Sequence, residues 1–133
     1  MKKRNILIVD DNKDYLRLIE CIVKQAGIKA HYATSGEEAV GLLKEGFFTT
    51  MITDLNMQGI DGYELATIAK DLSPDIDIVM ITGDISPDVS RLAAQAGIAK
   101  VIAKPVRAAQ IRRIVRDKPD SAALPETKIF NEI

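Results

Sequence analysis

The chain has 133 residues, of which 47% are hydrophobic and 28% are charged, and its formal net charge is −1. This length fits one domain with a substantial buried core, and the near-zero charge excludes a global attraction to nucleic acid or membrane. The single cysteine, Cys21, excludes a disulfide within the chain and is typical of a reducing compartment. No signal peptide is recognisable, and no segment approaches the roughly 20 apolar residues of a membrane helix. We therefore expect a soluble, cytoplasmic protein.

The first predicted strand is Asn5–Val9, a continuous apolar run typical of a strand buried on both faces of a sheet. It ends in the acidic pair Asp10–Asp11. Apolar residues then recur at helical spacing over 16–26, and Gly27 is a natural helix stop. The short alternating segment Ile28–Ala33 is the second predicted strand.

Ser35 and Glu38 have the spacing of a capping box and predict a helix that stops near Gly46. The next strand, Thr49–Asp54, ends abruptly in a carboxylate, although aspartate is disfavoured inside strands. A lone aspartate there would more often be a solvated strand end than a placed functional group.

The second half continues the alternation of helices and strands. The predicted elements are a helix capped at Asp61, a strand Ile76–Thr82, a helix from Ser86–Pro87 to Gly97, a strand Val101–Ala103 and a last helix over about Arg107–Arg116. Five strands alternating with five helices predict an α/β domain with a parallel sheet covered on both faces. Ligands of such sheets gather at the carboxyl ends of the strands, where the strand order reverses.

Polar residues directly follow four of the five predicted strands. They are Asp10 and Asp11 after the first strand, Asp54 after the third, Thr82 after the fourth and Lys104 after the fifth. The second strand ends instead in ordinary turn residues, Thr34–Ser35–Gly36. The other ends therefore predict a cluster of three carboxylates, a hydroxyl and an ammonium at one edge of the sheet.

The charges define what such a cluster needs. Two like charges about 4 Å apart repel by about 4 kcal/mol at an effective dielectric constant near 20, so three carboxylates either take up protons or bind a cation. Oxygen ligands favour Mg²⁺, which also shares phosphate oxygens. Lys104 can neutralise a phosphoryl oxygen, Thr82 can donate a hydrogen bond to another, and Asp54 can act as the nucleophile. Catalysis would then consist mainly of positioning and charge neutralisation.

This ordered set resembles the receiver domain of bacterial response regulators, the phosphoacceptor half of two-component systems. The resemblance covers Lys3 to about Arg116 and is carried by Asp10–Asp11, Asp54, Thr82–Gly83 and Lys104–Pro105. It implies a flavodoxin-like doubly wound (βα)5 fold with a five-stranded parallel sheet in the order 2-1-3-4-5.

The resemblance also implies the roles of individual residues. Mg²⁺ would be bound by Asp11, Asp54 and the backbone carbonyl of Asn56, with Asp10 in support, and a cis peptide before Pro105 would aim Lys104. The phosphoryl group would come from a phosphohistidine on a sensor histidine kinase or a histidine phosphotransfer protein. The domain would catalyse only its own phosphorylation and the loss of the phosphoryl group to water, so it would be a signalling domain and not an enzyme. Asn56 and Asp84, with Gly83 in the same loop, would tune that loss.

One position departs from the family pattern. The family often has an aromatic residue three positions before the lysine, whose ring turns inward when the threonine or serine engages phosphate. Val101 stands there in this chain and cannot make such a ring flip. We therefore expect Val101 to be a switch position at which the conformational change on phosphorylation is smaller than in the family or uses a different mechanism.

The segment Lys100–Lys118 is strongly basic and leaves two readings open. A solvated helix face is about twice as frequent as a docking face on composition alone. The resemblance instead favours an output surface near Lys100–Arg116 that docks a partner protein or domain. No helix-turn-helix or other reader of DNA follows, so we expect no direct contact with nucleic acid.

We expect a receiver domain over 1–117, followed over 118–133 by a C-terminal tail or the start of a linker. Ile129–Phe130 could form a short docking segment within it.

Three other functions remain in competition. A phosphatase similar to haloacid dehalogenases would need a second aspartate two residues after Asp54, where this chain has Asn56. A pseudo-receiver that binds partners without phosphorylation is consistent with Val101. Flavin binding would need a phosphate-binding loop in place of the two acids after the first strand.

Overall fold

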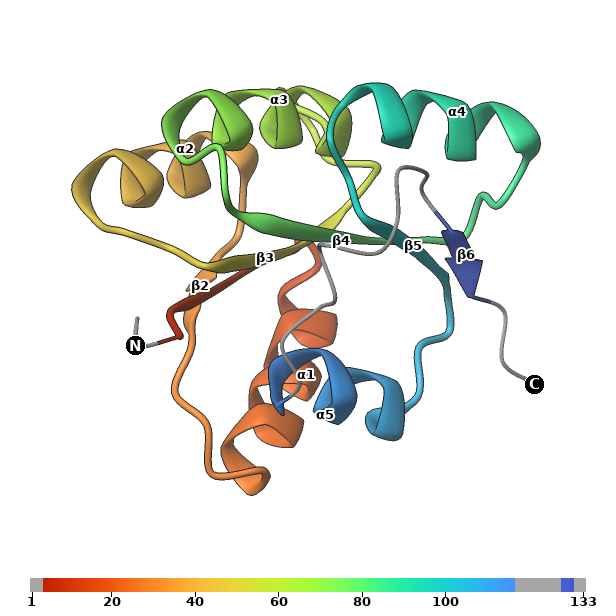
Figure 1. The fold of residues 1–133 in the computed structure, drawn as a ribbon. Coiled ribbons are helices and arrows are strands. Elements are labelled where there is room, and N and C mark those ends of the chain that lie inside the picture. The colour runs from red at the N-terminus through yellow and green to blue at the C-terminus, as the bar shows by residue number, and fades with distance from the viewer. Residues whose placement is uncertain (1–3, 117–127, 131–133) are drawn as a thin grey trace.

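The computed structural model describes residues 4–116 and 128–130 of the chain. Strands and helices alternate throughout, as Figure 1 shows. In chain order they are β1 (Ile6–Val9), α1 (Lys13–Gln25), β2 (His31–Ala33), α2 (Gly36–Glu45), β3 (Thr50–Asp54), α3 (Gly62–Leu72), β4 (Asp77–Thr82), α4 (Pro87–Gln95), β5 (Lys100–Ala103), α5 (Ala108–Arg116) and β6 (Lys128–Phe130).

The strands form one parallel sheet in the order β2-β1-β3-β4-β5-β6. Its first five strands have the expected order 2-1-3-4-5, which confirms the predicted fold. The sixth strand is an addition to that prediction. It pairs in parallel with β5, with Val101 opposite Ile129. The remainder of the expected tail, 118–127 and 131–133, lies outside the described residues, so the boundary expected at residue 117 stays a prediction.

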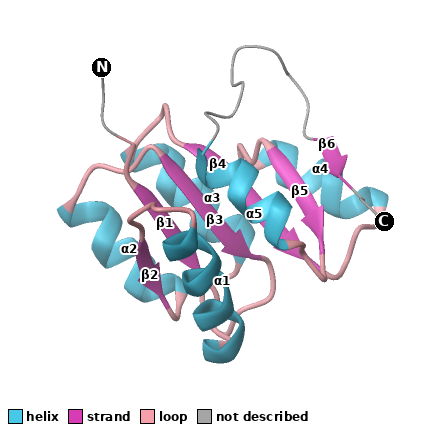
Figure 2. Ribbon diagram, turned by 90° about the horizontal axis from the view of Figure 1, so that it is seen from below, coloured by secondary structure: helices cyan, strands magenta, loops and turns pink. Residues whose placement is uncertain are grey.

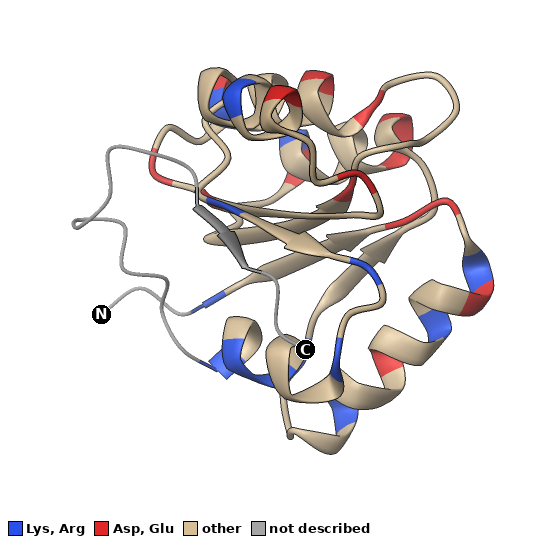
Figure 3. Ribbon diagram, turned by 90° about the vertical axis from the view of Figure 1, so that its right-hand side faces the viewer, with Lys and Arg blue, Asp and Glu red and all other residues tan. Residues whose placement is uncertain are grey.

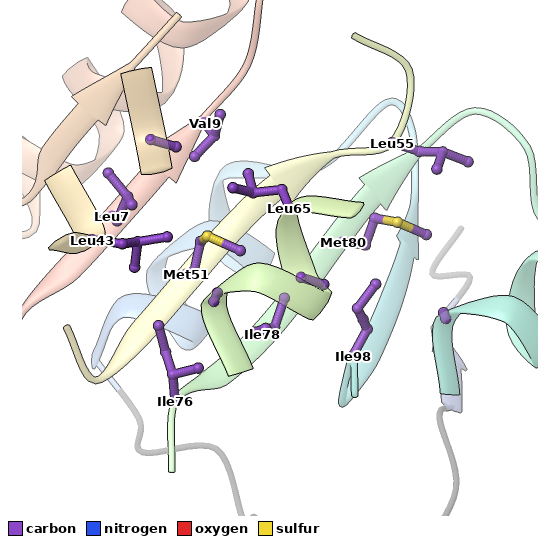
Figure 4. Packing of buried hydrophobic residues seen from close by; sticks show 14 of the residues in the cluster. Leu7, Val9, Leu43, Met51, Leu55, Leu65, Ile76, Ile78, Met80 and Ile98 are labelled. Carbon is purple, nitrogen blue, oxygen red and sulfur yellow. The ribbon is translucent and has the colours of Figure 1, made fainter. Parts of the chain in front are cut away.

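Two hydrophobic layers hold the helices against the sheet, and alternate residues of each strand enter opposite layers. Leu7 and Met51 pack under α2, α3 and α4, as Figure 4 shows, whereas Ile8 and Ile52 face α1 and α5. Figure 2 views the sheet from the α1 and α5 side. Every strand from β1 to β5 except the edge strand β2 is therefore apolar on both faces, which explains the continuous apolar runs in the sequence.

Short polar contacts fix where the helices begin. The side chains of Ser35 and Asp61 accept hydrogen bonds from the backbone N–H groups three residues later, at 3.0 Å and 2.9 Å, as the capping spacing predicts. Ser86 precedes α4 with Pro87 in the first turn, but its side chain makes no capping hydrogen bond. Among the described residues, no helix is long and apolar enough to cross a membrane.

Candidate functional site

The carboxyl ends of β1, β3, β4 and β5 lie at the same edge of the sheet, and the three aspartates and the lysine predicted there come together. The register places Asp54 opposite Ile81 and Thr82 opposite Ala103, so each of these strands ends within about one residue of its neighbour. Asp10 follows the end of β1, and Lys104 follows the end of β5. The backbone N–H of Lys104 donates to the carbonyl of Thr82 at 2.9 Å, which joins the last two strand ends.

Three carboxylates form a compact acidic cluster at this edge. Asp10, Asp11 and Asp54 each offer an oxygen, and these oxygens lie within 4.8 Å of one another. Asp10 and Asp54 are buried, with 3% and 8% of their surface exposed, whereas Asp11 is exposed. Buried carboxylates at this spacing fit a divalent cation with oxygen ligands.

The electrostatics of Asp10 reflect this crowding. Burial raises the pKa of Asp10 above its ordinary value, and the nearby charge of Asp54 raises it further. The backbone N–H of Asn12, which donates to Asp10 Oδ1 at 2.9 Å, acts in the opposite direction and lowers this pKa, as does Lys104. The ionised cluster is therefore costly without a compensating cation.

Lys104 supplies the positive charge that the protein itself brings to the cluster. Its Nζ lies 3.3 Å from Asp54 Oδ2 and 3.7 Å from Asp10 Oδ2. The peptide bond between Lys104 and Pro105 is cis, as the resemblance implied. The ammonium thus contacts the same carboxylate oxygen that would be free to react.

The two oxygens of Asp54 have different environments. Oδ1 accepts a hydrogen bond from the backbone N–H of Leu55 at 2.9 Å, while Oδ2 faces Lys104. The hydroxyl of Thr53 donates to the carbonyl of Asp54 at 2.9 Å, which fixes the backbone at the strand end. Asp54 therefore presents a carboxylate of defined orientation to the acidic cluster.

A protein-family comparison agrees with this geometry: the profile of the response regulator receiver domain matches residues 6–116. The chain belongs to the response regulator receiver domain family. Receiver domains are phosphorylated on an aspartate, use a divalent cation and act in two-component phosphorelay signalling, as signalling proteins and not as conventional enzymes.

Known relatives share both the sequence pattern and the fold. The chain is 32% identical over 117 residues to the chemotaxis protein CheY-3 of Vibrio cholerae, covering 84% of this chain and 88% of that protein. It is 31% identical over 108 residues to a response regulator receiver protein of an Anaeromyxobacter species, covering 81% of this chain but only 45% of that longer protein.

Solved structures of two further relatives superpose on most of the chain. A response regulator of Burkholderia pseudomallei with a phosphorylated aspartic acid and a calcium ion has a TM-score of 0.78 at 25% identity, covering 86% of this chain and 67% of that one. The receiver domain of Ssk1 from Saccharomyces cerevisiae, in complex with the histidine phosphotransfer protein Ypd1, has a TM-score of 0.80 at 25% identity, with 92% of each chain covered.

The other predicted site residues, Thr82, Gly83, Asp84 and Asn56, lie in the loops that follow β3 and β4 or at the end of β4. Thr82 is fully buried, and its Oγ1 accepts the backbone N–H of Asp84 at 3.1 Å, which leaves its own proton to donate. The carboxylate of Asp84 accepts the backbone N–H of Ser86 at 3.0 Å, so in this structure it shapes the loop before α4. Asn56 is exposed in the loop after β3, two residues beyond Asp54. A side-chain carbon at Gly83 would meet nothing within 4 Å, so space does not require glycine there.

Val101, which we expect from the sequence to be a switch position, lies away from solvent. It is fully buried in the layer under α2, α3 and α4 and pairs with Met80 of β4. Val101 packs in the layer on one face of β5, whereas its neighbour Ile102 belongs to the opposite layer. The structure thus places this position inside the core.

Three residues of the site escaped the sequence-based reasoning. Asn12 binds Asp10 through its backbone and caps α1 through its side chain, which accepts the N–H of Tyr15 at 3.0 Å. The ring of Tyr15 lies 4.7 Å from Lys104 Nζ. Gly62 packs so closely under β3 that a side-chain carbon there would lie 2.5 Å from the carbonyl oxygen of Asp54. Only Asn12 had a sequence signal, as a cap residue before a helical pattern.

Proposed function

We propose that Asp54 is the phosphoacceptor of this receiver domain and that the reaction depends on Mg²⁺. The phosphoryl donor would be a phosphohistidine on a sensor histidine kinase or a histidine phosphotransfer protein. The supporting observation is the convergence on Asp54 of a lysine ammonium at 3.3 Å and two further carboxylates within 4.8 Å. Family membership also supports a cytoplasmic location.

The residues of the chain divide the chemistry among them. Asp10, Asp11, Asp54 and the backbone carbonyl of Asn56 would hold Mg²⁺, whose charge offsets that of the incoming phosphoryl oxygens. An oxygen of Asp54 bonds to phosphorus while the phosphorus–nitrogen bond to the donor imidazole breaks, and the imidazole leaves with that electron pair and takes up a proton. Lys104 and Thr82 bind two of the phosphoryl oxygens. No external base is needed, because a carboxylate nucleophile has no proton to remove.

The loss of the phosphoryl group and the output signal would involve residues around this centre. Asn56, Gly83 and Asp84 border the approach of water to phosphorus and would tune the rate of hydrolysis. The output surface would lie near Lys100–Arg116, where basic residues gather on α5 and the loop before it (Figure 3). Since Val101 is buried and aliphatic, the signal would reach this surface through Thr82 and the β5–α5 loop and not through a ring flip.

A beryllofluoride titration in the presence of Mg²⁺ tests the assignment of Asp54. Beryllofluoride adds to a carboxylate as a phosphoryl mimic, so we expect it to raise the melting temperature of the wild-type protein only when Mg²⁺ is present. Asp54→Ala should abolish this stabilisation, while the matched change of an exposed aspartate far from the cluster, Asp75→Ala, should preserve it. Equal stabilisation of the Asp54→Ala protein would refute the assignment.

A further inference from the structure

The ring of Tyr15 lies beside the functional cluster without belonging to any of the predicted roles. Tyr15 is in the first turn of α1, where the capping contact of Asn12 with its backbone N–H fixes its position. The backbone of Asn12 also holds Asp10. One turn of chain therefore sets both the buried carboxylate and the ring.

The ring face contacts the ammonium of Lys104. Nζ lies 4.7 Å from the ring centroid, within the range in which an aromatic ring attracts a cation. The same Nζ lies 3.3 Å from Asp54, and the lysine side chain is 28% exposed. Lysine has four rotatable side-chain bonds, so a partly exposed ammonium would otherwise sample many positions away from the cluster. The ring and the carboxylates of Asp10 and Asp54 contact it from different elements of the fold.

The hydroxyl of Tyr15 lies next to the backbone of Val106 in the β5–α5 loop. Its oxygen is buried and has no hydrogen-bond partner of normal geometry among the described residues. Burial raises the pKa of Tyr15, which the neighbouring backbone of Val106 and the charge of Lys104 only partly oppose. Val106 follows the cis Lys104–Pro105 peptide, and Tyr15 and Val106 pack against the same hydrophobic layer. The ring and the hydroxyl of Tyr15 thus both face the β5–α5 loop, and the contact with the ammonium of Lys104 is made by the ring.

We propose that Tyr15 is a positioning residue that holds the ammonium of Lys104 over the acidic cluster, ready for the phosphoryl group. This inference rests on the proposed function of Asp54 and Lys104. It assigns a role to a residue of α1, which otherwise only covers one face of the sheet.

Three variants separate the ring, the hydroxyl and general packing. Tyr15→Phe retains the ring, and Tyr15→Leu retains an apolar side chain without it. Tyr32→Leu is the matched control, because Tyr32 packs against the same layer and its buried hydroxyl also has no hydrogen-bond partner in the part of the chain that the structure describes, yet it belongs to β2. We measure the rate of phosphorylation by acetyl phosphate at saturating Mg²⁺, the melting temperature, and the proton chemical shifts of the Lys104 ε-methylene group by NMR.

We expect Tyr15→Leu to slow phosphorylation by about three- to ten-fold, the scale of a cation–π contact, and Tyr15→Phe to remain within about two-fold of the wild type. Tyr32→Leu should lower the melting temperature without changing the rate. The upfield ring-current shift of the lysine protons should persist in Tyr15→Phe and disappear in Tyr15→Leu.

Other results would overturn the proposal. An unchanged rate in Tyr15→Leu would show that the ring has no role. An equal loss of rate in Tyr15→Phe would assign the effect to the hydroxyl, and an equal loss in Tyr32→Leu would assign it to general packing. The absence of a ring-current shift in the wild-type protein would also overturn it. If the wild-type protein takes up no phosphoryl group, the proposed function of Asp54 fails, while the NMR shift still decides whether the ring holds Lys104.

Discussion

The interior of the sheet and its carboxyl edge are built from the same strands but have opposite energetic character. Val9 and Ile81 are nearly completely buried among apolar neighbours, and burying such side chains stabilises the fold. One residue further along, Asp10 is buried almost as deeply beside another carboxylate, and its raised pKa shows that its charge is held at a cost. The stable interior thus holds in place a group of charges that would not assemble by themselves.

This difference explains why the edge can react. Lys104 alone cannot neutralise three carboxylates, so the cluster keeps an excess of negative charge until a cation binds. Reactive groups are commonly held in such unrelaxed surroundings, with the stability supplied elsewhere in the molecule. Changes in the interior should therefore alter stability, whereas changes at the edge should alter binding and reactivity.

A cavity in the interior should have the largest effect on stability. Ile78 is fully buried in β4 and pairs with Met51, far from the acidic cluster along the strand. We expect Ile78→Ala to lower the free energy of unfolding by about 2–5 kcal/mol, because it leaves an apolar cavity. Urea unfolding measures this loss. Mg²⁺ affinity measured on the folded protein should stay the same, and a large change in that affinity would show that interior and edge are not separable.

Gly62 connects the two regions, so its replacement should affect both. A side-chain carbon there would lie 2.5 Å from the carbonyl oxygen of Asp54 and 2.9 Å from Leu55 Cα, and both are backbone atoms that cannot move cheaply. We expect Gly62→Ala to cost about 1–3 kcal/mol of stability through overpacking and to weaken beryllofluoride binding.

Gly41 is the matched control for this substitution. It lies inside α2, and a side-chain carbon there would meet nothing within 4 Å. Gly41→Ala should stabilise the protein by about 0.5–1 kcal/mol, because alanine is the better helix former. If both glycine variants behaved alike, the close approach of α3 to Asp54 would have no functional meaning.

Neutralising Asp10 should separate stability from cation binding. Its pKa is raised above 3.8 in the folded state, so the folded protein binds this proton more tightly than the unfolded chain does. Stability contributed by this group is present below pH 3.8 and is lost as pH rises through the folded-state pKa. In the absence of divalent cation, Asp10→Asn should therefore be more stable than the wild type at neutral pH, with weaker Mg²⁺ binding. Unfolding free energies from pH 4 to 8, measured with and without Mg²⁺, test the predicted stability and the predicted loss of Mg²⁺ binding. An Asp10→Asn variant that is less stable than the wild type at every pH would contradict the predicted gain in stability.

A further expected effect lies in the alkaline range, away from the acidic cluster. Burial, assisted by the charge of Glu20, raises the pKa of Tyr32 from 10.0 to about 12. Its contribution to stability is complete below pH 10 and is lost as pH rises from 10 to about 12, because the folded state resists ionisation. Tyr32→Phe should flatten this loss, which thermal melts across that range measure. An identical decline in both proteins would show that other groups control alkaline unfolding.

The residues at the carboxyl edge of the sheet could be predicted from the sequence, because their placement depends only on where each strand ends. An apolar run such as Asn5–Val9 followed by acids marks both a buried strand and the residue that leaves it, and parallel pairing brings those residues together. The caps at Ser35 and Asp61 were equally readable, since their contacts span only three residues.

Contacts that depend on how elements pack were not readable. The ring of Tyr15 meets Lys104 only because α1 docks beside the β5–α5 loop at one particular rotation, which no local pattern encodes. Gly62 is required by the distance between α3 and β3. The strand β6 contains three residues, and its identity depends on pairing with the edge of β5 and not on its own short pattern.

The most direct measurement is the mass of the intact protein after incubation with acetyl phosphate and Mg²⁺. We expect the wild-type protein to gain the mass of one phosphoryl group and to gain none when Mg²⁺ is chelated. Asp54→Ala should keep its original mass under both conditions. An unchanged wild-type mass, or the same gain in Asp54→Ala, would contradict the assignment of this edge as a cation-dependent phosphoacceptor.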